Sequence, residues 1–378
     1  MENLAIFFGG KSSEHDISII TAIQVMNNVD IRKYNLVPVY IDEDNAWHYV
    51  DEYSKIDNYI NKIYKKNLVT GFFDKCLIKK TRYGFKKFKK IDIAINCCHG
   101  LNGEDGTLAG VFELNNIPFV GSGVLPSAIG MDKAIMKDVF NANNIPCVPF
   151  VATTKSEYKL GKDKFISSVI EKLGFPLIVK PANLGSSIGI NIANSVLELE
   201  NNIEIAFEYD NKILVENVVQ NLREINCSCI GNFEEVEVGV LEEPKNWKTF
   251  LDFNEKYLNK DIENSKVIDV SVSEEVDYKI KELSKNIFKI FGCSGVVRID
   301  FMVDDLTKEV YVNEINTIPG SYANYLWTKK YSFRQLINKL IEFAKNEYKY
   351  KNMNNYKFNS LVLKSFKENQ DKIKKFRK

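Results

Sequence analysis

The sequence predicts an α/β protein whose C-terminal half changes to an α+β arrangement. Residues 1–45 alternate strand, helix and strand, which is the pattern of a parallel sheet covered by helices. Residues 295–316 instead contain two apolar, strand-like runs around a polar turn, which is the pattern of an antiparallel hairpin. The chain has 378 residues, enough for two or three domains with their own cores.

The composition is that of an ordinary globular protein. Apolar residues make up 45% and charged residues 27% of the chain, and the formal net charge is +1. We therefore expect no nucleic-acid partner and no membrane partner, and we interpret the lysine runs at 86–90 and near the C-terminus as solvated faces. The sequence contains no recognisable signal peptide and no run of ~20 apolar residues, so we expect no membrane span.

The cysteine pattern indicates a reducing compartment, and we expect a cytoplasmic protein. The seven cysteines are odd in number and contain no Cys-x-x-Cys pair. Cys97 and Cys98 lie inside an apolar stretch, where buried free thiols are expected. The three histidines form no spaced cluster with the cysteines, which argues against zinc.

Each element of the N-terminal unit follows from a local pattern. Residues 4–8 predict a strand, and the apolar positions 19, 22, 23 and 26 have helical spacing. The remaining elements of this unit, assigned to residues 1–128, are a strand at 35–41, short strands within 46–90, a buried strand at 91–97, a glycine-rich segment at 99–107, a helix from Thr107 and a strand at 117–120.

Three further segments follow along the chain. They are a central unit at 129–217 with strands at 176–180 and 212–216, a C-terminal unit at 218–345 that contains the hairpin, and a lysine-rich tail at 346–378. The tail has little apolar periodicity, so we expect it to be partly disordered.

The hairpin carries the most informative residues. Side chains two apart in a strand point to the same face, so Arg298 should share a face with Asp300, and Glu314 with Asn316. Two carboxylates and an amide oxygen suit Mg²⁺ that is bound together with nucleotide phosphates. For these residues alone, a charged and solvated hairpin is an equally good interpretation.

A second group surrounds the strand that ends at Lys180. The small residues at 181–189 can form a loop whose N–H groups close over phosphate oxygens, although the segment is not a P-loop and such loops are often simple turns. Lys180 at the mouth of this buried strand is a reasonable phosphate ligand. Glu216 also ends a strand, where it could accept from ribose hydroxyls or be an ordinary surface glutamate.

Taken in order, these segments resemble the ATP-grasp ligases and, within them, the D-alanine–D-alanine ligases. The resemblance covers roughly residues 3–345 and consists of GGKSSEHDIS at 9–18, HGLNGEDGT at 99–107, GSGV at 121–124, MDK at 131–133, VKP at 179–181, LGSS at 184–187, KY at 256–257, RID at 298–300, EIN at 314–316 and PG at 319–320. It implies an N-terminal α/β substrate domain followed by a two-subdomain ATP-grasp fold.

The resemblance also implies where nucleotide and metal bind. ATP would lie between the second and third units, and its ligands would be Lys133, Lys180, Ser187, Glu216, Glu224 and Lys256. Two Mg²⁺ ions, for which Mn²⁺ can substitute, would be bound by Asp300 and Glu314 and by Glu314 and Asn316.

For the substrates, the resemblance implies that Glu14 receives the ammonium group of the first D-alanine. Glu14 would be linked to Ser186 and Tyr257, and His99, paired with Glu104, would lie near the same substrate. The segment around Lys256 and Tyr257 would close over the site. Arg298 and the backbone N–H of Gly320 would stabilise the oxyanion.

The implied activity is ATP-dependent joining of two D-alanines through an acyl phosphate, for peptidoglycan, by an enzyme that is commonly a homodimer. Tyr325 stands where many members have a serine that binds the carboxylate of the second substrate, and Ser321 could substitute for it. The alternatives are therefore D-serine or D-lactate as second substrate. A nucleotide-binding protein without catalysis is the alternative from another class.

Overall fold

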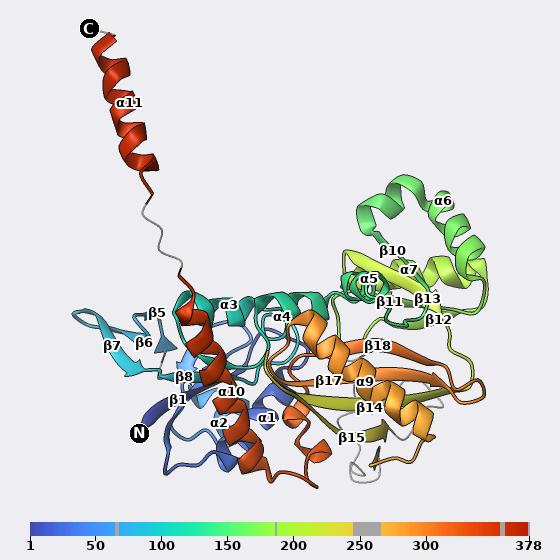
Figure 1. Ribbon diagram of the computed structural model, residues 1–378, viewed down its shortest axis with the longest axis horizontal. Coiled ribbons are helices and arrows are strands. Elements are labelled where there is room, and N and C mark those ends of the chain that lie inside the picture. Colours follow the sequence, from blue (N-terminus) through green and yellow to red (C-terminus); the bar gives the residue numbers. More distant parts are fainter. Residues whose placement is uncertain (65–67, 186, 245–265, 356–359, 377–378) are drawn as a thin grey trace.

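The computed structural model describes residues 1–64, 68–185, 187–244, 266–355 and 360–376 (Figure 1). Its strands form four sheets, and the strands of the smallest sheet lie in the chain between strands of the N-terminal sheet. The predicted change from a parallel sheet to antiparallel sheets is confirmed. Each of the described helices is too short or too polar to cross a lipid bilayer.

The N-terminal sheet has six strands in the order β4-β3-β2-β1-β8-β9. Its centre is parallel, because β1 (Glu2–Gly9) pairs with β2 (Tyr34–Ile41) and with β8 (Ile93–Asn96), and β8 pairs with β9 (Phe119–Val120). The helix α1 (His15–Asn28) connects β1 to β2, as its apolar spacing predicted. Two short antiparallel strands, β3 (Trp47–Tyr49) and β4 (Leu68–Val69), extend the edge of the sheet.

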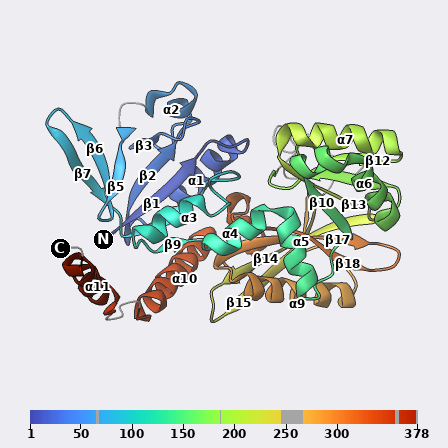
Figure 2. The same cartoon turned by 90° about the horizontal axis from the view of Figure 1, so that it is seen from above.

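Further strands and helices follow this sheet or are inserted between its strands. A separate antiparallel sheet contains β5 (Gly71–Phe73), β6 (Cys76–Thr81) and β7 (Gly84–Lys90), and the short helix α2 (Asp57–Ile60) precedes it. The helices α3 (Thr107–Leu114), α4 (Val124–Met131) and α5 (Lys133–Ala142) then run from the N-terminal sheet toward the next unit (Figure 2).

The central unit is a four-stranded antiparallel sheet in the order β10-β13-β11-β12. Its strands are β10 (Phe150–Thr154), β11 (Leu177–Pro181), β12 (Asn191–Ala193) and β13 (Lys212–Asn217), and its helices are α6 (Lys155–Leu173) and α7 (Val196–Tyr209). One core cluster joins these helices to β11 and β13. Both strands predicted for this unit are confirmed.

The C-terminal unit is a five-stranded antiparallel sheet in the order β16-β15-β14-β17-β18. The strands are β14 (Leu222–Gly231), β15 (Val236–Pro244), β16 (Lys266–Ile268), β17 (Gly295–Asp304) and β18 (Val310–Asn316), and α9 (Glu274–Phe291) lies across them in Figure 1. Apolar residues such as Cys227, Ile299 and Val312 pack beneath α9. Because side chains alternate along a strand, their polar neighbours point to the opposite face.

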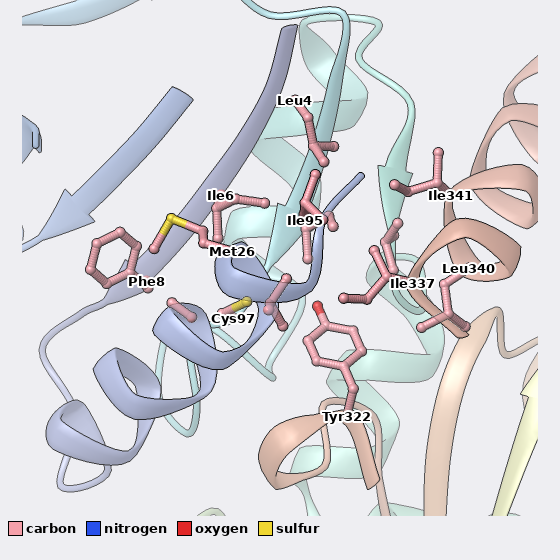
Figure 3. Packing of buried hydrophobic residues seen from close by; sticks show 14 of the residues in the cluster. Leu4, Ile6, Phe8, Met26, Ile95, Cys97, Tyr322, Ile337, Leu340 and Ile341 are labelled. Carbon is pink, nitrogen blue, oxygen red and sulfur yellow. The ribbon is translucent and has the colours of Figure 1, made fainter. Parts of the chain in front are cut away.

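After β18, the chain returns to the N-terminal unit. The 3-10 segment η3 (Gly320–Leu326) places Tyr322 among the buried residues of β1, α1 and β8, while Ile337 and Leu340 of α10 (Phe333–Met353) pack beside them (Figure 3). The hydroxyl of Tyr322 donates to the carbonyl of Asn96 at 2.6 Å. The segment that follows the five-stranded sheet is thus part of the N-terminal core.

The η3 segment is strained. Ser321, Tyr322 and Ala323 have φ values of 51°, 54° and 46°, in the left-handed region that side chains with a Cβ disfavour. Each such residue costs about 1–2 kcal/mol. The conformation is held by hydrogen bonds that Tyr322 makes to β8 and that Trp327 Nε1 makes to Ser228 Oγ at 3.1 Å. Strain of this kind is typical of functional sites.

The expectation for the C-terminal tail differs from the structure. The tail expected from residue 346 begins inside α10, which continues to Met353, and residues 362–376 form a further helix, α11 (Val362–Phe376). The composition argument missed both, because it weighed lysine and asparagine content and overlooked the helical spacing of Val362, Leu363 and Phe366 in α11. The boundaries at 128 and 217 stay predictions: residue 128 lies within α4, and residue 217 is the last residue of β13.

Candidate active site

One face of the five-stranded sheet carries a row of polar side chains. Glu242 of β15 is paired in register with Asn226 of β14, and Asn226 is paired with Asp300 of β17. Asp300 is in turn paired with Glu314 of β18. Directly opposed residues point to the same face of a sheet, so all four side chains lie on the face away from α9.

The neighbouring row completes the predicted patch. Arg298 is paired in register with Ser228 on one side and with Asn316 on the other. Arg298 and Asp300 are two residues apart in one strand and therefore share the face. The prediction that the hairpin is antiparallel and gathers its polar residues on one face is confirmed.

Arg298 and Asp300 form a two-pronged ion pair. The guanidinium Nε and one terminal nitrogen donate to the two carboxylate oxygens of Asp300, both at 2.7 Å, and Asn316 Nδ2 donates to the same carboxylate at 3.0 Å. Burial raises the pKa of Asp300, and although Arg298 opposes this, the nearby carboxylates of Glu314 and Glu242 add to it. A divalent cation at this position would relieve that repulsion.

Lysines from two other elements approach Glu314. Lys133 Nζ lies 3.3 Å from Glu314 Oε2 and donates to the Leu184 carbonyl at 2.9 Å. Asp132 caps α5 by accepting from the backbone N–H groups of residues 134 and 135, which fixes Lys133 as the first residue of the helix. Burial would raise the pKa of Glu314, but Lys133, Lys180 and Arg298 together lower it.

Glu216 lies deeper than the sequence suggested. Its side chain is 1% exposed and forms ion pairs with Lys180 through Oε1 and with Lys137 through Oε2, the latter at 2.7 Å. Lys180 also donates to Asn313 Oδ1 at 3.4 Å, and Asn313 directly precedes Glu314. The interpretation of Glu216 as a surface residue is wrong, because it is buried between two cations.

The N-terminal unit contributes Glu14 from the start of α1. A Cβ built on Gly185 would lie 3.1 Å from Glu14 Oε1, and one on Gly100 would lie 3.6 Å from Glu14 Oε2 and 2.4 Å from Ser12 Oγ. Glycine at these two positions therefore lets the loop after β8 and the loop after β11 approach the carboxylate. Elements of the N-terminal and central units meet at this residue.

His99 lies beside this carboxylate and is buried. Its Nδ1 is 3.7 Å from Glu104 Oε1, as the resemblance implied, and its Nε2 is 2.9 Å from Thr21 Oγ1. Burial acts to lower the pKa of His99, but Glu104 and Glu14 prevail and raise it. Thr21 also accepts from the backbone N–H of Ser321 at 3.2 Å, so it joins His99 to η3.

The two residues that could bind the carboxylate of the second substrate, Tyr325 and Ser321, point in different directions. Tyr325 donates to Glu242 Oε2 at 3.0 Å, and Glu242 also accepts from Asn226 at 3.2 Å. The Ser321 hydroxyl donates to Gln24 Oε1 on α1 at 2.5 Å. Tyr325, and not Ser321, therefore adjoins the row that contains Asp300.

The remaining predicted residues are placed less fully. Ser186, Lys256 and Tyr257 lie outside the described residues. Glu224 shares the strand face of Asn226, and Ser187 follows in the loop after β11. Gly320 begins η3, and a Cβ there would have no neighbour within 4 Å, so its surroundings are open.

Three contributing residues were missed by the sequence analysis. Lys137 could have been found, because it lies between Ala134 and Phe140 on the buried stripe of α5, where a lysine needs an anionic partner. Glu242 and Thr21 carry no such signal, since their importance depends on strand register and on contacts between distant segments.

The donor set fits a divalent metal bound with phosphates. Asp300, Glu314 and Asn316 offer hard oxygens on one face, and their negative charge is here neutralised by Arg298 and Lys133. A glycine-rich loop and two lysines adjoin them, and the same loop approaches Glu14 at Gly185. A site of this form on an antiparallel sheet, beside a smaller antiparallel sheet, is the arrangement expected of the ATP-grasp ligases that the sequence resembles.

Comparison with known proteins identifies the family. Residues 3–122 match the family described as "D-ala D-ala ligase N-terminus", and residues 139–342 match "D-ala D-ala ligase C-terminus". The D-alanine--D-alanine ligase of Thermosipho melanesiensis is 39% identical over 372 residues, covering 96% of this chain and 99% of the relative. The chain therefore belongs to the D-alanine–D-alanine ligase family.

Solved structures agree with this assignment. The VanG D-Ala:D-Ser ligase from Enterococcus faecalis is 31% identical with a TM-score of 0.77, over 91% of this chain and 99% of the other. The D-alanine--D-alanine ligase from Bacillus anthracis, complexed with ATP, is 27% identical with a TM-score of 0.66, over 93% of this chain and 100% of the other.

Proposed function

We propose that this protein is an ATP-dependent ligase that joins two D-alanines to D-alanyl-D-alanine for peptidoglycan. The observation that carries the proposal is the meeting of three units at one site. Glu14 comes from the N-terminal unit, Lys133 from α5, and the Arg298–Asp300 pair from the five-stranded sheet. Such a site can hold an amino acid next to a metal-bound triphosphate.

The nucleotide would lie between the central and C-terminal units. Lys133 and Lys180 would bind its phosphates, and Asp300, Glu314 and Asn316 would hold two Mg²⁺ ions, which neutralise the charge of the transferring phosphoryl group when bound. Lys133 is ion-paired with Glu314, and Lys180 is ion-paired with Glu216. Triphosphate would thus replace existing ion pairs, and the lysines would change anionic partners.

The first D-alanine would bind where Glu14 and His99 converge. Glu14 would receive its ammonium group, because the carboxylate faces two loops that glycines keep clear of side chains. His99, held by Glu104 and Thr21, would orient the substrate from the side of α1. Ser186 and Tyr257 remain proposed partners of Glu14, and Lys256 a proposed ligand of substrate and nucleotide.

The chemistry needs an activated carboxylate. The carboxylate of the first D-alanine would attack the γ-phosphorus of ATP, which releases ADP and gives an acyl phosphate whose phosphate group leaves in the next step. The amine of the second D-alanine would then attack the acyl carbon. Arg298 and the N–H of Gly320 would stabilise the oxyanion of the tetrahedral intermediate, which is typically the largest single electrostatic contribution.

A coupled assay of ADP release with D-alanine as sole amino acid tests the proposal, with the dipeptide quantified by mass spectrometry. ADP and D-alanyl-D-alanine should form in equal amounts. ADP release only when D-serine or D-lactate is added as acceptor would reject the D-alanine product and favour the alternative acceptors.

The hydroxyl of Tyr325 should matter for the second substrate. We expect Tyr325→Phe to raise the KM for the second D-alanine roughly tenfold, because the hydroxyl, which donates to Glu242, would turn its one proton to the substrate carboxylate, and a hydrogen bond to a charged group is worth about 1.5–3 kcal/mol. The KM for ATP should change little. The measurement is the D-alanine dependence of dipeptide formation, with D-serine tested as acceptor in parallel.

Tyr331→Phe is a matched control. The Tyr331 hydroxyl donates to Glu237 at 2.9 Å, and Glu237 lies on β15, the strand that also carries Glu242. That variant should keep the wild-type KM. Equal KM values for wild type and Tyr325→Phe would contradict a role of the Tyr325 hydroxyl in acceptor binding.

A further inference from the structure

Lys137 is a buried cation to which the reaction described above assigns no role. It lies one helical turn after Lys133 on α5, and its side chain is 1% exposed. Its Nζ is 2.7 Å from Glu216 Oε2 and 3.4 Å from the carbonyl of Val148, and it lies 5.6 Å from the centre of the Phe150 ring. A charge buried this deeply is costly unless it is paired.

The two lysines that flank Glu216 differ in what else they can reach. Lys180 contacts Asn313, the residue before Glu314, and its charge acts on Glu314. Lys137 faces the opposite oxygen of Glu216, toward the segment before β10. Among the described residues, its only ion pair is the one with Glu216. Lys180 is therefore the cation that can move to a phosphate, while Lys137 stays.

We infer that Lys137 is a positioning residue for nucleotide binding: it keeps the Glu216 carboxylate charged and oriented toward the nucleoside when Lys180 leaves for the phosphates. This role rests on the proposed function, because it assumes that ATP binds beside Lys180. A charged carboxylate at residue 216 accepts hydrogen bonds from ribose hydroxyls or the adenine amino group, which a neutral acid would do less well.

Charge balance around Glu216 explains why one lysine is not enough. Burial acts to raise the pKa of Glu216, but Lys137 and Lys180 together lower it to about 2. The Cys147 thiol also faces this pair, and burial raises its pKa, so it stays neutral. If Lys137 were absent, departure of Lys180 would leave a buried carboxylate without a cation, and that carboxylate would tend to take up a proton.

The test is the ATP affinity of Lys137→Met, measured by calorimetry with Mg²⁺ between pH 6 and 9. We expect binding to weaken at least roughly tenfold at pH 8, as expected when a buried charge loses its partner. The loss should grow as pH rises, because binding to the variant would require proton uptake at Glu216. The wild-type affinity should show no such added slope.

A double variant separates this role from simple packing. Lys137→Met combined with Glu216→Gln should bind ATP as well as Glu216→Gln alone, since no buried carboxylate then needs a cation. This comparison stays informative if the single Lys137→Met variant does not fold. Lys155→Met is the matched control, because this part-buried lysine of the same unit bonds only the Phe207 carbonyl, at 2.9 Å, among the interactions described for it.

The outcomes are distinct. Lys137→Met with wild-type affinity at every pH, or a double variant roughly tenfold weaker than Glu216→Gln, would overturn the inference while the proposed function stood. Wild-type protein that bound no ATP would reject the proposed function, and the role of Lys137 with it.

Discussion

Arg298→Ala is expected to lower the rate of dipeptide formation by at least ~10²–10³-fold, the usual cost of losing one oxyanion donor. The loss should be larger still, because Arg298 is also the two-pronged partner of Asp300. Removing it would leave that carboxylate close to Glu314 without its cation. The decrease should appear in kcat at saturating ATP and D-alanine, measured as ADP release and as dipeptide.

Arg223→Ala provides the control for this variant. Arg223 lies on the same sheet and is similarly exposed, and it forms an equivalent fork onto Glu243 with distances of 2.8 and 2.7 Å. Because that pair is outside the polar row, the control should retain most of its activity. An equal loss of activity in both variants would indicate damage to the sheet and would contradict the oxyanion role of Arg298.

Glu314→Gln should have the second large effect. Glu314 is the residue proposed to contact both metal ions, and a metal supplies several kcal/mol of transition-state stabilisation. Weaker metal binding should therefore lower kcat by roughly 10²-fold or more and shift activity to higher Mg²⁺ concentrations. The measurement is a titration of ADP release against Mg²⁺ at fixed ATP.

Glu309→Gln tests whether the loss of any negative charge on this hairpin is enough to shift the Mg²⁺ dependence. Glu309 is exposed in the turn before β18, where it accepts from the Tyr311 hydroxyl at 2.6 Å. Its removal should leave the Mg²⁺ dependence unchanged. An unchanged Mg²⁺ dependence in Glu314→Gln would place the metal elsewhere.

Much of the fold was predictable because its signals are local. The strand at 4–8, the helix around Ile19 and Met26 and the hairpin at 295–316 each carry their own periodicity, and all three are present. The continuation of α10 to Met353 was not predictable in this way, because lysine and asparagine carry no apolar stripe. The small sheet β5–β7 was expected only as unspecified short strands.

The site divides along the same line. Arg298 and Asp300 could be assigned to one face because strand alternation is a property of the sequence itself. The burial of Glu216 between two lysines could not, since Lys137 and Lys180 come from different elements that only the tertiary fold brings together. The pairing of Tyr325 with Glu242 likewise depends on a segment crossing from one unit to another.

The dual anchoring of η3 has a consequence for protein engineering. Tyr322 is fixed to β8 and Trp327 to β14, with Tyr325 held between them. A graft of this stretch from a relative with another acceptor preference could lack both hydrogen bonds. The backbone of the three left-handed residues would then relax to a less strained conformation. Altered selectivity should therefore require that the grafted loop keep Tyr322 and Trp327, whose acceptors are the Asn96 backbone carbonyl and the Ser228 hydroxyl.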